Sequence, residues 1–419
     1  GLKVIANSSS LKYKGGDADP MSVANELNVA AVLKGRILRQ GKELSISVEL
    51  IDGRDRTQIW GEQYRRPSTD LLALQADISR DIAEKLKLRL TVPQQQKIAA
   101  HEQQNSEAYE LLLKGRFHHY KGDSENRKRA LEYFNKAIEL DSGYALAYAE
   151  LSNTYRALIG YSVLNPQEYL PKAEAAAQRA LELDETLADA HNALANVKAY
   201  RWDWQGADME FRRALELNPN LAIAHRYYAV FLSFLGRHEE AVNEITRTRE
   251  LDPLSLEANT TLGFVLCNAR RYDEGIEVLN KTIAVERNHS GTYWFLGYCY
   301  PAKHMYKEAI GAFEKAIELG QNTPGTQIRL GTAYAHAGDR ARAETILKQL
   351  QTSKEYVSPL ELAILYIALG EREQAFASIE KAYNQHDLNF RFLNVSHEFD
   401  SIRSDSRFQD YVRRVGLAS

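Results

Sequence analysis

Small and large apolar residues recur through the second half of the chain at a fixed spacing of 34 residues. One column of positions holds only small residues, a second holds large apolar residues, and in a third each residue is followed by Ala or Gly. The columns are Ala207, Ala241, Gly275, Ala309 and Ala343; Phe211, Ile245, Leu279, Phe313 and Leu347; and Leu194, Tyr228, Leu262, Leu296 and Leu330. Three columns that stay in register over five units indicate a solenoid of helix–turn–helix repeats.

The stretch RWDWQGADMEFRRALELNPN, residues 201–220, shows how one unit is built. Ala207, Phe211 and Ala214 are spaced by four and three residues, which places them on one face of a helix. A small residue where two helices cross, followed one turn later by an aromatic ring, is typical of packing between paired helices. We therefore interpret the stretch as mainly the second helix of a repeat and not as a site.

Three less regular units extend this array. Ala130, Phe134 and Ala137 belong to the second helix of one unit, and the next unit begins near Tyr148. Its second helix, over residues 173–183, is delayed by the insertion GYSVLNPQEYLP. An eighth unit follows the regular set and contains Leu362, Ala363, Tyr366, Gly370, Ala375, Ile379 and Ala382. We predict a mainly α fold in which about eight helix pairs, over residues 105–388, form a right-handed solenoid.

Residues 1–92 do not follow the repeat and predict a small α/β domain. Three runs with a period of two residues, over 30–39, 43–51 and 57–64, are joined by Gly-containing turns, which favours an antiparallel sheet. We expect a short strand over 2–6 and a short helix over 21–27. A longer helix, capped by Ser68 or Thr69, would present an apolar stripe to the sheet. The stripe consists of Leu71, Leu74, Ile78, Ile82 and Leu86.

Two further segments lie outside the repeats. Residues 93–104, PQQQKIAAHEQQ, are polar and read as a linker. Residues 389–419 break the period, and a solenoid needs a terminal cap over its last apolar face. We expect the cap to cover the eighth unit with Phe399, Ile402, Phe408, Tyr411 and Val412. Within the sixth unit, Pro301 should end or kink the first helix near Tyr300.

The composition excludes some classes of function. A net charge of −3 and the lack of a basic stripe give no indication of nucleic-acid binding. No run approaches the roughly 18–20 apolar residues that a membrane span needs. Cys267 and Cys299 fall in the first helices of different repeats, and we expect them to be buried free thiols. The chain begins with Gly1 instead of Met, from which we expect a fragment of a longer protein.

The chain lacks the sequence signatures of an enzyme. It contains no phosphate-binding loop, no kinase signature, no nucleophile elbow, no C-x-x-C and no H-E-x-x-H. His118 and His119 are adjacent on a helix and diverge by about 100°, which suits no shared metal. His191 and His225 take matching places in successive repeats and are expected to pack between helices. We predict no catalytic residue, no metal and no cofactor.

Repeats such as ANTTLGFVLCNARRYDEGIEVLNKTIAVERN resemble tetratricopeptide (TPR) repeats, and the resemblance covers about two-thirds of the chain. More narrowly, WDWQGADMEFRRALELNPN and FDSIRSDSRFQDYVRRVGL resemble the TPR tails of bacterial signalling proteins. The N-terminal region, from GLKVIANSSSLKYKG to IWGEQY, resembles the FlgO-like or TolB-N-terminal-like domain of those proteins. The resemblance implies a sensory or scaffolding module that follows a kinase, a cyclase or a winged-helix domain, and it favours a periplasmic over a cytoplasmic location.

A solenoid offers a concave groove lined by the first helix of each unit. The helical phase indicates which residues line this groove. We expect it to bind a protein or peptide, because aromatic rings give contact area, Asn satisfies peptide groups and Arg binds carboxylates. The predicted groove residues are Asn153, Arg156, Asn192, Asn196, Tyr200, Arg226, Tyr227, Phe264, Trp294, Tyr298 and Arg329. Phe234, Asn268, Phe295 and His336 lie in the same rows.

The sequence therefore predicts a non-enzymatic interaction scaffold. The alternative is a regulatory module of a membrane kinase, a cyclase or a transcription regulator that acts through the α/β domain or through dimerisation. The identity of the partner and the oligomeric state, including a homo-oligomer, stay open at this point.

Overall fold

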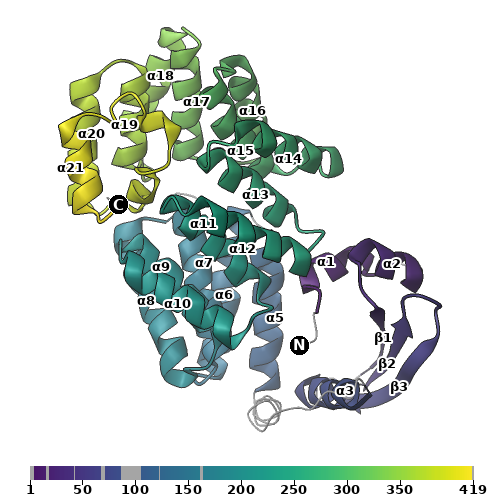
Figure 1. The fold of residues 1–419 in the computed structure, drawn as a ribbon. Coiled ribbons are helices and arrows are strands. Elements are labelled where there is room, and N and C mark those ends of the chain that lie inside the picture. Colours follow the sequence, from purple (N-terminus) through teal and green to yellow (C-terminus); the bar gives the residue numbers. More distant parts are fainter. Residues whose placement is uncertain are drawn as a thin grey trace.

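The computed structural model describes residues 4–15, 18–41, 43–67, 71–85, 105–121, 123–160 and 164–417 (Figure 1). The predicted linker over 93–104, the cap at Ser68 or Thr69, and Leu86 all lie outside these residues. The domain boundaries given above therefore stay predictions. Within the described residues, no helix is both long enough and apolar enough to cross a bilayer.

The N-terminal region contains a three-stranded antiparallel sheet in the order β1-β2-β3. Its elements are α1 (Asn7–Ser10), η1 (Leu11–Tyr13), α2 (Pro20–Leu27), β1 (Ala31–Gln40), β2 (Glu43–Asp52), β3 (Gln58–Pro67) and α3 (Leu71–Lys85). Leu44, Ile46, Val48 and Leu50 share one buried face of β2 and cluster with Leu74 of α3. The predicted strands, their buried face and the helix over 21–27 are confirmed.

The predicted strand over residues 2–6 is wrong for its described part. Residues 4–6 form no strand. The Ala6 amide instead donates to the Leu251 carbonyl (2.7 Å), and the Ser9 hydroxyl donates to Asp252 (2.5 Å). An extended segment needs backbone partners, and here they come from the end of α12 in the array and not from the sheet.

The array consists of eight helix pairs, as predicted. The first helices are α5 (Ser106–Lys121), α7 (Ala145–Gly160), α9 (Ala188–Tyr200), α11 (Ala222–Phe234), α13 (Leu256–Asn268), α15 (Ser290–Cys299), α17 (Pro324–His336) and α19 (Pro359–Ala368). The second helices are α6 (Ser124–Leu140), α8 (Pro166–Leu183), α10 (Trp204–Leu217), α12 (His238–Leu251), α14 (Tyr272–Val285), α16 (Tyr306–Glu318), α18 (Arg340–Gln351) and α20 (Arg372–Asn384).

The small and large columns of the sequence meet inside each pair. Ala207, Phe211 and Ala214 are fully buried, so their interpretation as packing residues is confirmed. A methyl group at Gly263 would lie 2.5 Å from Leu279, and one at Gly297 would lie 2.7 Å from Phe313. Glycine therefore follows the Leu column at these two positions because a large side chain of the second helix fills the space.

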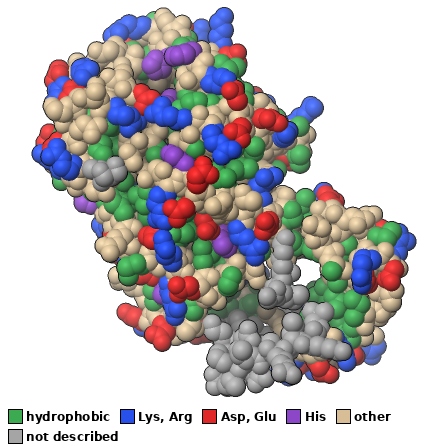
Figure 2. Space-filling model, viewed as in Figure 1, with side chains coloured by type: hydrophobic (Ala, Val, Ile, Leu, Met, Phe, Trp, Pro, Cys, Tyr) green, Lys and Arg blue, Asp and Glu red, His purple; other side chains and the backbone are tan. Residues whose placement is uncertain are grey.

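The first helices form the inner layer of the solenoid. First helices of neighbouring units pack against each other, for example α7 on α9 and α17 on α19, whereas second helices pack mainly on the first helices of their own and the next unit. Because the first helices are closer together, the surface that they line is the concave one. On the face of the molecule that Figure 2 shows, acidic and basic side chains are interspersed.

The sixth unit is interrupted where the sequence predicts it. α15 ends at Cys299 and continues as a 3₁₀ turn, η2 (Tyr300–Lys303), that contains Pro301. His304 then adopts a φ of 60°, in the left-handed region. Gly236 and Gly338 have the same left-handed conformation at the matching turns, so His304 takes a position that other units give to glycine.

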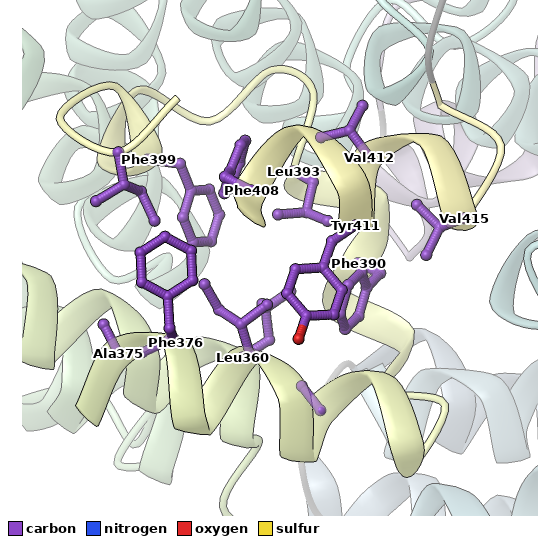
Figure 3. Packing of buried hydrophobic residues seen from close by; sticks show 14 of the residues in the cluster. Leu360, Ala375, Phe376, Phe390, Leu393, Phe399, Phe408, Tyr411, Val412 and Val415 are labelled. Carbon is purple, nitrogen blue, oxygen red and sulfur yellow. The ribbon is translucent and has the colours of Figure 1, made fainter. Parts of the chain in front are cut away.

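The chain ends with η3 (Leu388–Phe392), η4 (His397–Phe399) and α21 (Ser406–Arg414). The five expected cap residues, Phe399, Ile402, Phe408, Tyr411 and Val412, are all buried and cluster with α19 and α20. Figure 3 shows Leu360 and Phe376 pointing toward the rings of the cap. The expectation that this region covers the eighth unit is confirmed.

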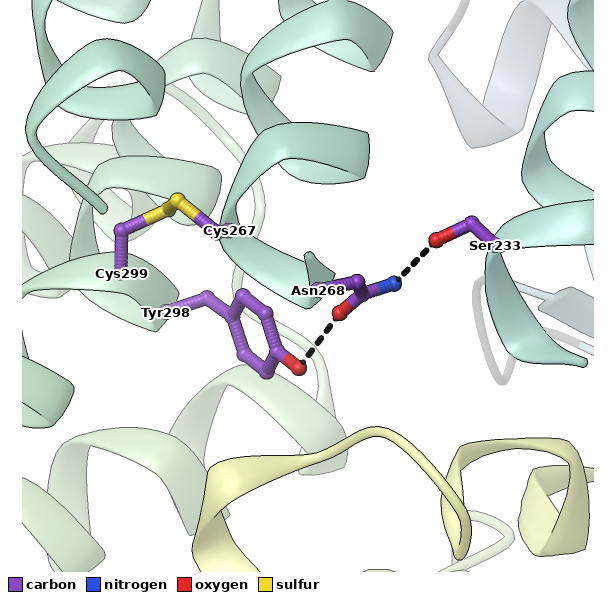
Figure 4. The surroundings of a disulfide bond; sticks show 5 residues. All are labelled: Ser233, Cys267, Asn268, Tyr298 and Cys299. Atoms are coloured by element: carbon purple, nitrogen blue, oxygen red, sulfur yellow. Dashed lines mark hydrogen bonds between the residues drawn. A yellow bond between two sulfur atoms is a disulfide. The ribbon is translucent and has the colours of Figure 1, made fainter. Parts of the chain in front are cut away.

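Cys267 and Cys299 form a disulfide, so the expectation of free thiols is wrong. The two residues lie in the last turns of α13 and α15, which are adjacent first helices, and their Cα atoms are 5.8 Å apart. Figure 4 shows the bond beside Asn268 and Tyr298. Because the two cysteines are 32 residues apart, close to one repeat, the stacking of the units brings them together.

Candidate peptide-binding groove

The inner layer of the array carries a segment of the same chain. We call residues 387–399 the C-terminal segment. Its Leu388 packs with Val197 and Tyr200 of α9. Its Phe392 lies 4.8 Å from Phe234 and 6.4 Å from Phe264, between ring centroids. The segment therefore lies on first helices of the third, fourth and fifth units, while its Phe390 packs against Leu360 of α19 in the eighth unit.

Charged groups fix the two ends of the C-terminal segment. The buried Asp387 carboxylate accepts hydrogen bonds from the Ser358 hydroxyl (2.6 Å) and the Asn389 amide (2.9 Å), and burial raises the pKa of Asp387. At the other end, Glu398 forms an ion pair with Arg329 of α17. A buried charge is stable only when it is paired or hydrogen-bonded, so these contacts make the position of the segment specific.

The middle of the segment is held by its arginines. The Arg391 guanidinium lies 4.5 Å from the ring centroid of Tyr200 and 5.3 Å from that of Phe234. Arg403, which follows the segment, donates to the carbonyls of Leu393 (3.1 Å), Asn394 (2.9 Å) and Ser396 (2.7 Å). The Arg403 side chain thus satisfies three backbone carbonyls of the C-terminal segment.

Four predicted groove residues are not open to a partner. Tyr200, Phe264, Tyr298 and Arg329 are buried, and the expectation that they line an open groove is wrong. The physical reason is the C-terminal segment, which brings Arg391 to Tyr200, Phe392 to Phe264, His397 to Tyr298 and Glu398 to Arg329.

The sixth unit contributes rings that pack as a cluster. The half-buried Trp294 lies parallel to Tyr298, at 6.1 Å between ring centroids, and perpendicular to Phe295 at 5.0 Å. The Tyr298 hydroxyl donates to Asn268 (2.9 Å), whose amide donates to Ser233 (2.8 Å), as Figure 4 shows. Burial raises the pKa of Tyr298 to about 12. Replacing Trp294 or Tyr298 would disturb packing as well as any binding.

The predicted asparagines are buried between first helices. Asn192 is fully buried, and neither polar atom of its side chain has a hydrogen-bond partner among the described residues. Asn196 donates to the Asn192 carbonyl (2.8 Å), one turn earlier in α9. Asn153 is 7% exposed, and its Oδ1 likewise accepts no hydrogen bond within the described part of the chain. Asn192 and Asn196 therefore do not present their amides on an open groove.

The remaining predicted residues form a cluster in the partly exposed half of the inner face. Arg156 of α7 donates to the Tyr227 hydroxyl (2.6 Å), and its guanidinium lies 4.3 Å from the Tyr227 ring centroid. Arg226 lies 4.4 Å from the same ring. We call Arg156, Tyr200, Arg226, Tyr227 and Arg391 the arginine–tyrosine cluster. The sequence predicted four of its members, and the structure brings them together with Arg391.

The arginines of this cluster lower the pKa of its two tyrosines. Burial raises the pKa of Tyr227, but the charges of Arg156, Arg226 and Arg127 together outweigh burial, and the pKa is lowered overall. The pKa of Tyr200 is lowered in the same way, because Arg391 and Arg156 outweigh burial. Nearby positive charge favours the ionised form of a phenol, and the guanidinium groups of Arg156, Arg226 and Arg391 supply this charge beside the two rings.

Sequence reasoning missed the residues that come from the C-terminal segment, namely Arg391, Phe392 and Glu398. The available signal was the pattern NFRFLN at residues 389–394, where two aromatic residues flank an arginine just after the repeat period breaks. Such a pattern on a terminal segment is compatible with an anchor as well as with a cap.

His191 and His225 lie in contact with the second helices of their units, as predicted. His191 contacts Glu210 (2.7 Å) and the Glu185 carbonyl (2.9 Å), and His225 contacts Glu244 (2.5 Å) and the Pro219 carbonyl (3.0 Å). Among the residues that the structure describes, no group of three or more His, Cys, Asp or Glu could hold a metal ion.

Comparison with known proteins gives partial matches. No family profile matches the chain. The chain is 33% identical over 152 residues to "Putative adenylate cyclase 3" of Rhizobium meliloti strain 1021, which corresponds to 36% of this chain and 26% of that protein. The chain therefore spans about a quarter of the length of this curated relative.

Solved structures with similar helix pairs include yeast Tom70, a tetratricopeptide repeat protein from Parabacteroides merdae and PilF of Pseudomonas aeruginosa. Tom70 is 16% identical with a TM-score of 0.45, over 73% of this chain and 67% of Tom70. The P. merdae protein is 17% identical with a TM-score of 0.44, over 64% and 100% of the two chains. PilF is 24% identical with a TM-score of 0.35, over 49% and 92%.

The repeat itself identifies the architecture of the helical array. Its period is 34 residues, each unit is a helix pair, and small residues of one helix receive large residues of the other. These are the defining features of one repeat class. The region from α5 to α20 is a tetratricopeptide-repeat α-solenoid.

Proposed function

We propose that the chain is a non-enzymatic scaffold that binds a protein or a peptide on the inner face of its solenoid. The observation that supports this is the C-terminal segment, a piece of chain with two 3₁₀ turns, η3 and η4, that already lies on the inner face. It is held by stacked rings, an arginine over a tyrosine, and an ion pair. An external peptide would use the same kinds of contact.

The partner would bind in the half of the inner face formed by α5, α7, α9 and α11. The C-terminal segment contacts this half through Leu388, Phe390, Arg391 and Phe392. Arg156, Arg226 and Tyr227 are half-buried there, so part of each side chain can meet a ligand. Arg and Tyr are the residue types most enriched at binding hot spots, where truncation costs about 2 kcal/mol or more.

The test is capture of partners from a native lysate by the full chain. We expect a protein that is retained by the wild type and lost by the Arg226→Ala, Tyr227→Ala double variant. Arg249→Ala removes the same charge from an exposed position on α12 and should retain the protein. Equal retention by all three proteins, or retention by none, would argue against a groove-binding scaffold, provided that circular dichroism shows equal helix content.

A second candidate function rests on the match to "Putative adenylate cyclase 3". In this case the chain is the regulatory part of a longer signalling protein, and its sheet is a FlgO-like or TolB-N-terminal-like sensor domain. The disulfide favours an oxidising compartment such as the periplasm for this part. An immunoblot of native cells with an antibody against the array tests it. A band far above 47.5 kDa supports the regulatory module, and a band at that mass contradicts it.

A further inference from the structure

We infer that the C-terminal segment is a proton-dependent latch, which lies on the inner face most tightly when one carboxylate of a buried cluster takes up a proton. The inference concerns how the segment is held and needs no partner. If the proposed function is correct, the latch regulates it, because the segment contacts Tyr200, Phe264 and Tyr298 of the inner face. The residues that we call the latch cluster are Arg329, Glu361, Asp387, Arg391 and Glu398.

The latch cluster joins the segment to two first helices at one buried place. Arg329 lies in α17, 3.8 Å from Glu361 in the first turn of α19, and Glu398 of the segment pairs with the same arginine. The side chains of Arg329, Glu361 and Glu398 are 2%, 12% and 8% exposed. Asp387 is buried and Arg391 is half-buried. The docked segment therefore keeps most of this cluster away from bulk water.

Among the described residues, the latch cluster brings three carboxylates to two guanidinium groups. Arg329 is shared between Glu361 and Glu398, and the charge of Arg391 acts on both Glu361 and Asp387. A buried carboxylate without a counter-charge of its own is costly and takes up a proton instead. We therefore expect one carboxyl group of the cluster to be protonated while the segment is docked.

The pKa values of two members agree with this count of charges. Burial raises the pKa of Glu361, and the charges of Arg329 and Arg391 do not outweigh burial. Burial also raises the pKa of Asp387, although hydrogen bonds and the charge of Arg391 lower it. The proton that the cluster lacks in positive charge is thus shared between Glu361 and Asp387.

Two other ionisable groups adjoin the cluster and stay neutral between pH 5 and pH 8. Tyr356 faces Asp387, and burial raises the pKa of Tyr356 far above this range. His397 precedes Glu398, and burial, followed by the charge of Arg329, lowers the pKa of His397 to about 3. Neither group therefore supplies positive charge to the cluster.

A neighbouring carboxylate shows the effect of sufficient arginine. Burial raises the pKa of Asp400, but hydrogen bonds from Arg270 and Arg403 outweigh burial, and the pKa is lowered overall. Asp400 therefore stays ionised at neutral pH. The latch cluster differs because its carboxylates outnumber its arginines.

The direction of the pH dependence follows from these shifts. The docked segment binds the proton more tightly than the released segment, in which the carboxyl groups meet water and have a pKa of about 4. Docking is therefore strongest below about pH 4 and weakens by up to about tenfold per pH unit above that value. The contribution of the proton is lost once the pH has risen through the docked pKa, so acid closes the latch.

Hydrogen exchange of the full chain tests this inference. The measured quantity is the protection of residues 387–399, which is the exchange rate of an unstructured peptide of the same sequence divided by the rate in the chain at the same pH. We expect the protection at pH 5 to exceed that at pH 8 by about tenfold or more. The protection of α5 to α10 should change far less.

Variants of the cluster show whether its carboxylates are responsible. Glu361→Gln and Asp387→Asn each remove one negative charge and keep the shape of the side chain. Each should give equal protection at both pH values, at the level that the wild type reaches at pH 5. The matched control Glu355→Gln removes the same charge from an exposed position before α19 and should behave like the wild type.

Equal protection of the wild-type segment at both pH values would overturn the inference. Stronger protection at pH 8 would also overturn it, since the arginines would then hold all three carboxylates ionised. A pH dependence that persists in either variant with wild-type helix content would assign the effect to groups outside the cluster. Partner capture is a separate measurement, so a latch without a captured protein would count against the proposed function alone.

Discussion

At the scale of single residues, the repeat copies side-chain contacts as well as helices. His191 and His225 are 34 residues apart, and each contacts a glutamate 19 residues later and a carbonyl six residues earlier. The contacts join the first helix of a unit to its second helix and to the preceding turn. A column of the sequence therefore corresponds to one repeated three-dimensional arrangement, and these histidines need no functional explanation.

His191 gives a pH-dependent prediction. Burial lowers its pKa, but the hydrogen bonds to Glu210 and to the Glu185 carbonyl, together with the charge of Glu210, outweigh burial, and the pKa is raised overall. Because the folded state binds the proton more tightly than the unfolded state, this contribution is complete below about pH 6.5, the unfolded value, and is lost as the pH rises through the folded pKa. His191→Gln should therefore destabilise the chain by about 1–2 kcal/mol at pH 5.5 and by less at pH 8.5.

Thermal unfolding of both proteins at the two pH values measures this difference. Lys198 also contacts Glu210 (2.8 Å), so Lys198→Gln serves as a control that lacks a titrating group in this range. A loss of melting temperature that is equal at both pH values for His191→Gln would show that the imidazolium form makes no special contribution.

At the scale of helices and strands, most of the fold follows from pattern. The alternation over Leu44 to Leu50 predicts β2 and its buried face, and Pro301 predicts the end of α15. The strand expected over residues 2–6 fails because a short apolar run has no period of its own and takes its partner, Leu251, from another part of the molecule. The local alternation of polar and apolar residues does not predict which distant segments pair with each other.

The disulfide was missed for a related reason. Two cysteines 32 residues apart look unrelated in a linear sequence, and only their matching places at the ends of neighbouring first helices make them close. The repeat period contains this information, since residues about one period apart lie side by side on stacked units. Position within the unit is therefore a better guide to pairing than the number of cysteines.

Breaking this disulfide should destabilise the fifth and sixth units. Closing a loop of this length lowers the entropy of the unfolded chain by an amount worth roughly 3–4 kcal/mol. We expect a chain with Cys267→Ser and Cys299→Ser to melt at a lower temperature than the wild type, and a reductant to lower the melting temperature of the wild type only. Differential scanning calorimetry with and without reductant measures both effects. The expectation would be contradicted if the reductant left the melting temperature of the wild type unchanged although a thiol assay showed that both cysteines were reduced.

At the scale of the whole molecule, the C-terminal region joins the eighth unit to the third and fifth units of the array. Beyond the cap on the eighth unit, the Trp204 ring N–H donates to the Val415 carbonyl (2.6 Å), and Arg270 forms two hydrogen bonds of 2.8 Å with Asp400. The sequence predicted the cap because the last apolar face of the array has to be buried and residues 389–419 contain apolar side chains that can bury it. It could not predict contacts between residues 211 positions apart, because the curvature of the solenoid brings them together.

These contacts raise the question of whether the C-terminal segment can leave the inner face while the helices stay folded. Phe392 is the residue to change, because it contacts Phe234 and Phe264 of the array but is itself only half-buried. Removing a packed aromatic ring costs about 3–5 kcal/mol, and here the loss falls on the segment before it falls on the helix pairs. Phe392→Ala should therefore release residues 387–399 and uncover Phe234 and Phe264.

Hydrogen exchange measured by mass spectrometry reports directly whether residues 387–399 leave the inner face. We expect faster exchange over residues 387–399 in Phe392→Ala and unchanged exchange in α5 to α10, whereas Phe117→Ala, which removes an exposed ring from α5, should leave the segment protected. A uniform rise in exchange along the whole array would instead mean that the segment is an inseparable part of the core. In the expected case, the surface around Phe234 and Phe264 would become available to a partner only when the segment moves. The partner would then compete with the chain's own aromatic and arginine anchors.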